Sequence, residues 1–479
     1  MRFIVFPTTL FSSPYLPSTI ESDIDEIILI EEPIYIYDPK WQECRVNKNK
    51  IAFFRCAMKF YMQQITNIFK KKNIVYYDYE QALKLPASLF QDAHAWDPCD
   101  WSIKQKYNCI KFHTSPMFLL DHNDLETLYS KNTKRLAQVY EYIKSKIGVL
   151  QGIKSYDKDN RKMLPPHLII PAIPTYSTSR TKKYYNEAIR YANTSKFRHH
   201  TGDPRNVILS PITHSDAMSH LAYFLKNKLD KFGPYQDAIS KDHVYLFHAN
   251  ISHLLNIGLI TPRDVLDNVL LYKNTVPLQS LEGFIRQLIG WREFMRYLYI
   301  KHFDVIIKPF KHSGPHLNPF TWKTRVVSID NEIEKAKNTG YAHHIIRLMM
   351  FLNFMKLIDM PPISIYRWFM EVVSNDAYPW VMYTNIATMG YYTTIPFMQK
   401  PYISTSSYIQ RMSDYKHRSD IWDSLFYRYI AQPSNLKSGA KVYLRNKAAF
   451  DRFPPQKRAM LLNMASNYLI GMHKNSKYT

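Results

Sequence analysis

The stretch LEGFIRQLIGWREFMRYLYI, residues 281–300, is the most informative part of this chain. Its apolar residues recur at helical spacing and define one face of a helix: Phe284, Leu288, Trp291, Met295 and Leu298. Arg286, Arg292 and Glu293 flank that face. Most helices with this pattern are core helices with solvated charges, and that interpretation stays open. A second string, YAHHIIRLMM at 341–350, also places polar groups inside an apolar helical pattern.

Composition predicts a basic globular protein with two or three domains. The chain has 479 residues, more than one core usually supports, and 46% of them are hydrophobic. Its 63 basic residues outnumber its 40 acidic ones, a formal charge of +23 with neutral histidines. Such an excess favours a polyanionic partner such as DNA. A generally basic protein without such a partner is the alternative.

The four cysteines are Cys44, Cys56, Cys99 and Cys109, and they lack CxxC spacing. We interpret them as reduced intracellular thiols, which excludes a disulfide framework and predicts no metal site. No run of about 18 apolar residues predicts a membrane span. The stretch MRFIVFPTTLF predicts a β-strand rather than a signal sequence. We therefore expect a soluble, intracellular, monomeric protein, in the nucleus or the cytoplasm.

The pattern along the chain predicts an α/β half followed by an all-α half. Strand and helix patterns alternate over residues 1–150, which predicts a mainly parallel sheet flanked by helices. Strands are expected at 2–6, 26–30, 73–77 and 108–113, and helices at 48–69 and 123–147. Residues 151–211 are rich in proline, so we expect a linker there rather than one continuous helix.

Strand patterns nearly vanish after this linker, so residues 212–433 predict an all-α domain. Helices are expected at 216–231, 246–257, 262–272, 281–303, 327–338, 343–358 and 363–373. The remaining residues, 434–479, form a basic segment of mixed pattern. Basic residues also cluster at 70–72, 180–183 and 437–445, where they could follow a nucleic-acid backbone.

Nine strings resemble segments of the photolyase/cryptochrome superfamily, in the family's order and at near-family spacing. They are NKIAFFRCAM (49–58), DKDNRK (157–162), FGPYQDAI (232–239), GFIRQLIGWREF (283–294), YAHHIIRLM (341–349), YRWFMEV (366–372), DAYPWV (376–381), KPY (400–402) and YIQRMSDY (408–415). The chain is most similar to the deoxyribodipyrimidine photolyase-related branch, the bacterial iron–sulfur (6-4) photolyases and cryptochromes. This resemblance implies a Rossmann-like α/β antenna domain and an all-α domain of the FAD-binding photolyase type.

The resemblance also implies an activity. In the family, light drives an electron from FAD to a damaged pyrimidine pair flipped into a pocket of the protein. His343 and His344 match the paired histidines beside the lesion, where a histidine would donate a proton at neutral pH. As structure alone, the two histidines would cap a helix or pack beside it.

Five residues match family segments that bind the cofactor. Arg286, Trp291 and Arg292 match the helix lining the flavin cavity, and ordinary ion pairs are the alternative role of the two arginines. His248 and Ser252 match a pyrophosphate-binding HSxxS segment. The segment reads HANIS here, so the resemblance implies one hydroxyl donor fewer.

Four further residues complete the expected site. Asn385 and Met389 are expected in a loop near the flavin pocket. Trp322 and Trp368 match tryptophans that relay electrons to the flavin. Aromatic side chains more often pack in a core, which is the alternative role of both tryptophans.

Three cofactor positions depart from the family pattern. The cluster ligands align with Ser328, Lys416 and Ser419, and no cysteine follows Cys109, so we expect no iron–sulfur cluster. The turn at 393–396 reads TTIP where the family tends to have Asp-Gly-Gly. The strand end at 7–10 reads PTTL instead of GDQL, which argues against a lumazine-type antenna pigment.

These departures leave two main hypotheses. The first is a light-dependent DNA photolyase, a carbon–carbon lyase that uses FAD to repair (6-4) ultraviolet damage. The second is an inactivated photolyase fold that lacks the iron–sulfur cluster and FAD and is reused as a DNA-binding or structural protein. A cryptochrome-like light sensor is a third possibility that needs FAD but not repair. Bound FAD therefore separates the second hypothesis from the other two.

Overall fold

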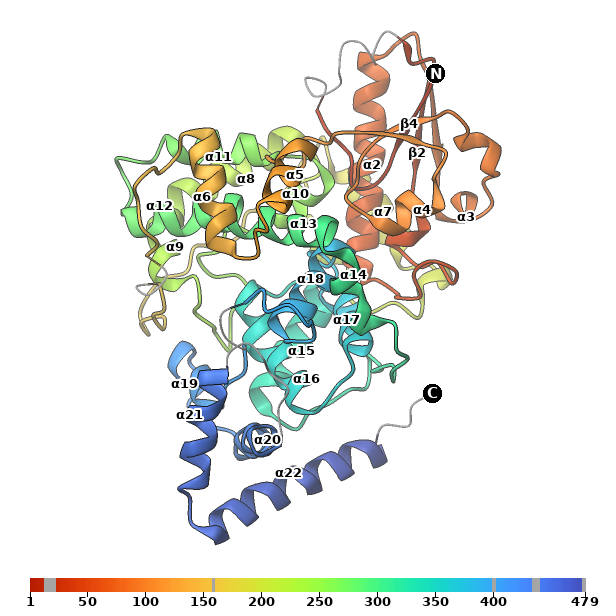
Figure 1. Ribbon diagram of the computed structural model, residues 1–479. Helices are drawn as coiled ribbons and strands as arrows, with labels where there is room; N and C mark the ends of the chain where they lie inside the picture. Colours follow the sequence, from red (N-terminus) through yellow and green to blue (C-terminus); the bar gives the residue numbers. More distant parts are fainter. Residues whose placement is uncertain (13–22, 157–159, 399–401, 433–439, 476–479) are drawn as a thin grey trace.

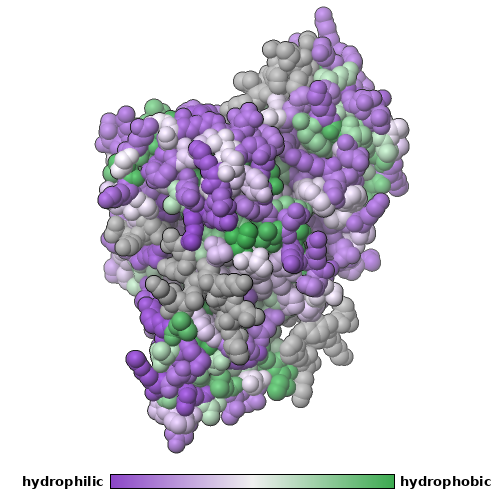
Figure 2. All heavy atoms as spheres, in the orientation of Figure 1, coloured by the Kyte–Doolittle hydropathy of each residue, from purple (hydrophilic) through white to green (hydrophobic). Residues whose placement is uncertain are grey.

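The computed structural model describes residues 1–12, 23–156, 160–398, 402–432 and 440–475 (Figure 1). Part of the family strings at 157–162 and 400–402, and part of the basic cluster at 437–445, lie outside these ranges. Among the described residues, no helix is long and apolar enough to cross a membrane. Hydrophilic residues cover most of the face shown in Figure 2.

A five-stranded parallel sheet forms the core of the N-terminal part, with strand order β3-β2-β1-β4-β5. The strands are β1 (Arg2–Val5), β2 (Glu26–Ile30), β3 (Asn73–Tyr77), β4 (His94–Trp96) and β5 (Lys111–His113). The expected α/β class with a parallel sheet agrees with this architecture. The sequence analysis missed β4, because three residues are too few to show a strand pattern.

Short helices and one long helix pack around this sheet. They are η2 (Pro33–Tyr35), α2 (Lys48–Ile68), α3 (Tyr79–Ala82), η3 (Ala87–Phe90) and α4 (Trp101–Lys106). The side chain of Asn47 caps α2 by accepting a hydrogen bond from the amide of Asn49. The expected linker contains η4 (Ser195–Phe197), η5 (Pro204–Leu209) and α7 (Lys182–Ala192), and α7 packs along α2.

The expected helix at 123–147 is two helices, α5 (His122–Ser130) and α6 (Leu136–Ile147). The chain turns between them at Asn132, whose φ is +52°. Both helices pack against the helical half of the protein rather than on the sheet, and Figure 1 shows α6 among the later helices. A Cβ on Gly290 would lie 3.2 Å from the Tyr140 ring, so this contact is close. The domain limits at 150, 211 and 433 stay predictions.

Helices dominate from residue 214 onward. They are α8 (His214–Asn227), α9 (Leu229–Tyr235), α10 (Ser252–Ile257), α11 (Pro262–Leu270), α12 (Leu278–Ile285), α13 (Arg292–Lys301), α14 (Phe303–Ile307), η7 (Lys308–Phe310), α15 (Val327–Thr339), α16 (Asn353–Leu357), α17 (Pro362–Val372), α18 (Pro379–Met389), α19 (Ser407–Met412) and α20 (Asp420–Ala431). The basic terminal segment contains two more helices, α21 (Ala440–Asp451) and α22 (Pro455–Asn475), which pack on α20.

Two π-helical segments interrupt these helices. The first, η6 (Arg286–Trp291), joins α12 to α13, and the second, η8 (Ile346–Leu352), leads into α16. The first falls inside the string at 281–300, and the second begins inside the string at 341–350 and ends two residues after it. A π-helix has a wider turn than an α-helix and occurs often at functional sites. Periodicity did not predict either segment, because the local pattern differs little from that of an α-helix.

Candidate functional site

A cavity of about 250 Å³ lies between the helices of the C-terminal half. Its walls come from α9, the segment before α10, the α12–η6–α13 run, the start of η8 and α18. Seven of the predicted site residues line it: His248, Ser252, Trp291, Arg292, His343, His344 and Asn385. Small-molecule pockets usually measure roughly 300–1,000 Å³, so this cavity is slightly smaller than that range.

Four predicted site residues do not line the cavity. Arg286 lies 3.3 Å from the carboxylate of Glu282, one helical turn earlier, and not beside Glu293 or Glu371, the partners expected for an ordinary ion pair. Met389 is buried in the core at the end of α18. Trp322 and Trp368 form a buried edge-to-face pair with ring centroids 5.6 Å apart. Their roles toward a cofactor stay predictions.

Asn385 and Met389 lie in a helix, so the expectation of a loop was wrong. Pro379 occupies the first turn of α18, where its fixed φ suits a helix start. The sequence of α18, PWVMYTNIATM, is apolar on nearly every side and therefore lacks the periodic pattern by which amphipathic helices are recognised. Its burial explains this composition, because nine of its eleven residues are buried.

Three histidines meet at one end of the cavity. The rings of His248 and His343 stack with centroids 4.3 Å apart and planes 21° from parallel. His344 packs edge-to-face on Trp291, with centroids 5.1 Å apart. The Nε2 atom of His248 lies 2.8 Å from the carbonyl of Gln236. Neither ring nitrogen of His343 has a hydrogen-bond partner among the described residues.

All three imidazoles are neutral at neutral pH in the free protein. Burial lowers the pKa of His248 to about 4 and that of His344 to about 3. It also lowers the pKa of His343 well below the ordinary value, and the positive charge of Arg347 adds to this effect. A neutral imidazole can donate a hydrogen bond, but it does not carry the second proton of an acid catalyst. Proton donation at neutral pH therefore needs a bound group that raises these pKa values.

Arg292 presents unpaired donors to the cavity. Its Nη1 donates to the side-chain oxygen of Asn256 at 2.6 Å, and its guanidinium lies over the rings of Phe118 and Trp380. Its Nε and Nη2 are buried without a hydrogen-bond partner in the described part of the chain. Burial lowers the pKa of Arg292 to about 10, so the side chain stays charged at neutral pH. Buried, unpaired N–H groups of a charged side chain indicate an acceptor supplied by a ligand.

The cavity residues fit a polar aromatic ring system. Arg292 offers donors, while Asn385 Oδ1 and Gln236 Oε1 are buried acceptors without partners among the described residues. The HANIS segment fits a pyrophosphate less well. The hydroxyl of Ser252 donates to the carboxylate of Asp376 at 2.6 Å, and this buried negative charge opposes an anion there. In its chemistry, the site therefore fits a flavin ring better than it fits a pyrophosphate.

Glu293, in the same signature string, connects the two halves of the chain. It is fully buried and accepts hydrogen bonds from the amides of Leu119 and Leu120, at 2.8 and 3.3 Å. Arg296, one turn later, lies over the ring of Phe118 and contributes positive charge beside this carboxylate. The sequence indicated charged residues beside an apolar face. It could not show that Glu293 binds the segment at Leu119 and Leu120, because these residues lie more than 170 positions earlier in the chain.

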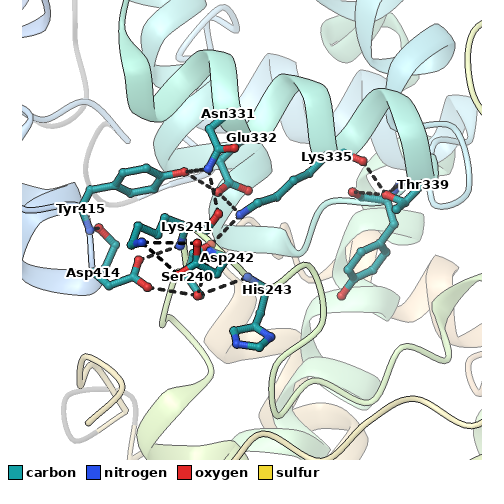
Figure 3. Close-up of polar contacts among 12 residues, drawn as sticks. Ser240, Lys241, Asp242, His243, Asn331, Glu332, Lys335, Thr339, Asp414 and Tyr415 are labelled. Carbon is teal, nitrogen blue, oxygen red and sulfur yellow. Dashed lines mark hydrogen bonds and ion pairs between the residues drawn. The ribbon is translucent and has the colours of Figure 1, made fainter. Parts of the chain in front are cut away.

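A polar network includes Glu332, one turn after Ser328, and Tyr415, next to Lys416, so in sequence it adjoins two of the positions expected for cluster ligands (Figure 3). On α15, Glu332 Oε1 accepts hydrogen bonds from Lys335 at 2.7 Å and from the hydroxyl of Tyr415 at 2.9 Å. Lys335 also donates to the carbonyl of Ser240 at 2.6 Å. Asp414 accepts from the hydroxyl of Ser240 and the amide of the next residue, at 3.2 and 2.6 Å. The network joins α15, the segment before α10 and the segment after α19.

The residues at these positions do not fit an iron–sulfur cluster. Ser328 lies one turn before Glu332, Lys416 follows Tyr415, and Ser419 caps α20 by accepting from the amide of Trp422. Hydroxyl and ammonium groups do not replace the thiolates that bind iron. Among the described residues, no group of three or more histidine, cysteine, aspartate or glutamate side chains is arranged to hold a metal ion.

Replacing Lys335 by methionine should lower the free energy of unfolding by about 3 kcal/mol, because it leaves the buried carboxylate of Glu332 without its counter-charge. Urea denaturation measures this loss. Lys323→Met is the matched control, since Lys323 pairs with Glu334 of the same helix but both side chains are largely exposed. Equal losses in the two variants would show that the buried ion pair of Lys335 contributes no more to the free energy of unfolding than an exposed one.

Comparisons with known proteins agree with this fold. The family model for deoxyribodipyrimidine photo-lyase-related proteins matches residues 3–208. A (6-4) photolyase of Agrobacterium fabrum is 28% identical to this chain over 401 residues, which cover 77% of this chain and 78% of that protein. These two matches support the photolyase-related branch.

Two further comparisons extend this assignment. The crystal structure of a bacterial class III photolyase from Agrobacterium tumefaciens resembles this chain with a TM-score of 0.51 and 12% identity, and the match covers 99% of this chain and 98% of that one. This likeness supports the photolyase fold of a parallel sheet and a helical part. Uncharacterized protein R853 of Acanthamoeba polyphaga mimivirus is 56% identical over 68 residues, which are 14% of this chain and 52% of that protein.

Proposed function

We propose that this photolyase-related chain is a FAD-dependent DNA photolyase that uses light to repair (6-4) ultraviolet damage. The observation that carries the proposal is the cavity, which brings together His343, His344, Trp291, Arg292 and Asn385. These residues come from three separate parts of the sequence. A cavity with unpaired buried donors and acceptors is the form expected of a ligand site.

Each residue type has a part in this proposal. Arg292 and Asn385 would hold the polar edge of the flavin, and Trp291 would pack beside it. FAD, when bound, supplies the light-driven electron to the damaged base. The buried pair Trp322 and Trp368 provides neighbouring indole rings for electron return. The net charge of +23 favours binding of the DNA backbone.

A second function is a photolyase fold without flavin that binds DNA or has a structural role. The hydrogen bond between Ser252 and Asp376 favours it, because it places a carboxylate where the family binds a pyrophosphate. The modest volume of the cavity, about 250 Å³, favours it as well. A light sensor without repair activity would also bind FAD. It would differ from the first proposal in leaving damaged DNA unrepaired.

The flavin content of the purified protein tests these proposals. We expect a yellow protein that releases close to one FAD per chain on denaturation. Leu288→Trp should lower this content strongly, because Leu288 lines the cavity and the larger ring fills it. Leu271→Trp is the matched control at an exposed position. A colourless protein that takes up no added FAD would leave only the second function.

The DNA assay then separates repair from sensing. A duplex that contains one (6-4) photoproduct should be restored under blue light and remain unchanged in the dark. Flavin in the protein without restoration would favour light sensing instead. Duplex binding should weaken steeply as salt rises, because neutralising phosphates releases counterions.

A further inference from the structure

Arg347 is a half-buried cation that lines the cavity. It lies on η8, one turn after His343, and lines the cavity together with the histidines. Its Nε is buried without a hydrogen-bond partner, and no ion pair forms to it in the part of the chain that the structure describes. A partly buried guanidinium without a counter-charge is unfavourable unless a ligand supplies one.

The acidic residues that line the cavity contact groups other than Arg347. Asp376 accepts a hydrogen bond from the hydroxyl of Ser252 at 2.6 Å, and Asp237 lies 4.0 Å from Arg161. The groups whose charge acts on His343 are His248, Arg347, His344 and Lys335, and all of them are basic. This end of the cavity therefore combines a free guanidinium with three imidazoles and attracts an anion.

We propose that Arg347, with His343 and His344 beside it, forms a phosphodiester subsite that holds the backbone of a nucleotide flipped into the cavity. The proposal rests on the proposed DNA function and names the contact by which the substrate is held. A guanidinium matches the oxygens of a phosphodiester through two parallel hydrogen bonds. The pyrophosphate of FAD shares this chemistry, and the experiment below distinguishes the two sources.

Occupation of this subsite has a consequence for the histidines. A phosphodiester bound to Arg347 cancels the positive charge that lowers the pKa of His343 and His344 and adds a negative charge beside them. Their pKa values then rise, while burial, the larger cause of the low pKa values, stays in place. Proton uptake on DNA binding should therefore be larger in the wild type than in a variant without the Arg347 charge.

The first test is DNA binding by Arg347→Gln, measured by fluorescence anisotropy at several salt concentrations. With a duplex that contains a (6-4) photoproduct, we expect at least a tenfold weaker Kd and a salt slope reduced by about one. Undamaged duplex should be affected less, because its nucleotides stay stacked outside the cavity. Arg347→Lys should recover part of the affinity. Arg263→Gln is the control, since Arg263 lies within 3.8 Å of Asp267 on the exposed face of α11.

The second test is calorimetry in two buffers that differ in ionisation enthalpy, at pH 7. The wild-type protein should take up protons on binding damaged duplex, and Arg347→Gln should take up fewer. Thermal unfolding of each variant confirms that it is folded.

Three outcomes would overturn the subsite. If Arg347→Gln loses FAD but keeps the wild-type salt slope, the anion is the cofactor's pyrophosphate. If it matches the wild type in affinity, slope and proton uptake, Arg347 holds no phosphate although the proposed function stands. If the wild-type protein itself binds no damaged duplex at low salt, the DNA function fails and the subsite fails with it.

Discussion

Lowering the pH from 7 to 4 should unfold this protein cooperatively. Five buried histidines drive the transition: burial lowers the pKa of His200, His220, His248 and His253 to about 4, and that of His344 to about 3. Because these pKa values lie below the unfolded value of about 6.5, the stabilisation is present above pH 6.5 and is lost as the pH falls. Each pKa unit corresponds to about 1.4 kcal/mol, so at pH 4 the summed loss is comparable to the usual stability of about 5–15 kcal/mol.

Buried carboxyl groups oppose part of this effect. Burial raises the pKa of Asp100 to about 6 and raises the pKa of Glu293 and Glu332. A raised carboxyl pKa favours the folded state as the pH falls, which is the opposite sign. The histidines are more numerous and more strongly shifted, so we expect unfolding to begin between pH 6 and pH 5.

Circular dichroism during a pH titration measures this transition. His253→Leu should move the midpoint to lower pH, because it removes one titrating group that contacts Phe53 and whose Nε2 has no partner among the described residues. His312→Gln, at an exposed position, should leave the midpoint unchanged. A protein that keeps its fold and its melting temperature at pH 4 would contradict the inference that these five buried histidines are neutral in the folded state.

His343→Ala should reduce light-dependent repair of a (6-4) duplex by at least about 100-fold, the usual range for loss of a positioned proton donor. His343 is buried against His248, and both of its ring nitrogens are available to a ligand. His343→Gln should fail equally, because glutamine keeps hydrogen-bonding groups but carries no titratable proton. Single-turnover rates of photoproduct restoration under fixed illumination measure the effect.

Flavin content should be retained in both His343 variants. Rates measured at saturating protein concentration separate lost chemistry from weaker DNA binding. His243→Ala is the control, since His243 is exposed on the loop shown in Figure 3. Repair by His343→Gln at the wild-type rate would show that the position serves packing alone.

Much of the fold was predictable from local pattern. The strands at 26–30 and 73–77 match β2 and β3 residue for residue, because apolar runs bounded by polar residues leave little choice of boundary. The helix expected at 246–257 begins only at Ser252, since Asn250 has a φ of +50° that interrupts it. The turn between α5 and α6 and the helix α18 were missed, because burial and packing rather than periodicity determine them.

The candidate site was predictable as a set of residues and not as an arrangement. The family strings identified Trp291, Arg292 and His343, which lie together on the cavity wall. Arg347 lies in the same string as His343, but it was not singled out. Its lack of a counter-charge depends on distant elements, and a single string does not show which carboxylates are engaged elsewhere.

The position of α6 has a consequence for synthesis. Tyr140 of α6 packs beside Gly290. The segment against which α6 packs is therefore synthesised about 150 residues after the helix itself. At about 5–20 residues per second, the ribosome needs roughly 8–30 s to synthesise that segment. During this interval α6 bears a bare apolar face, so a nascent chain stalled near residue 200 should be a strong chaperone client.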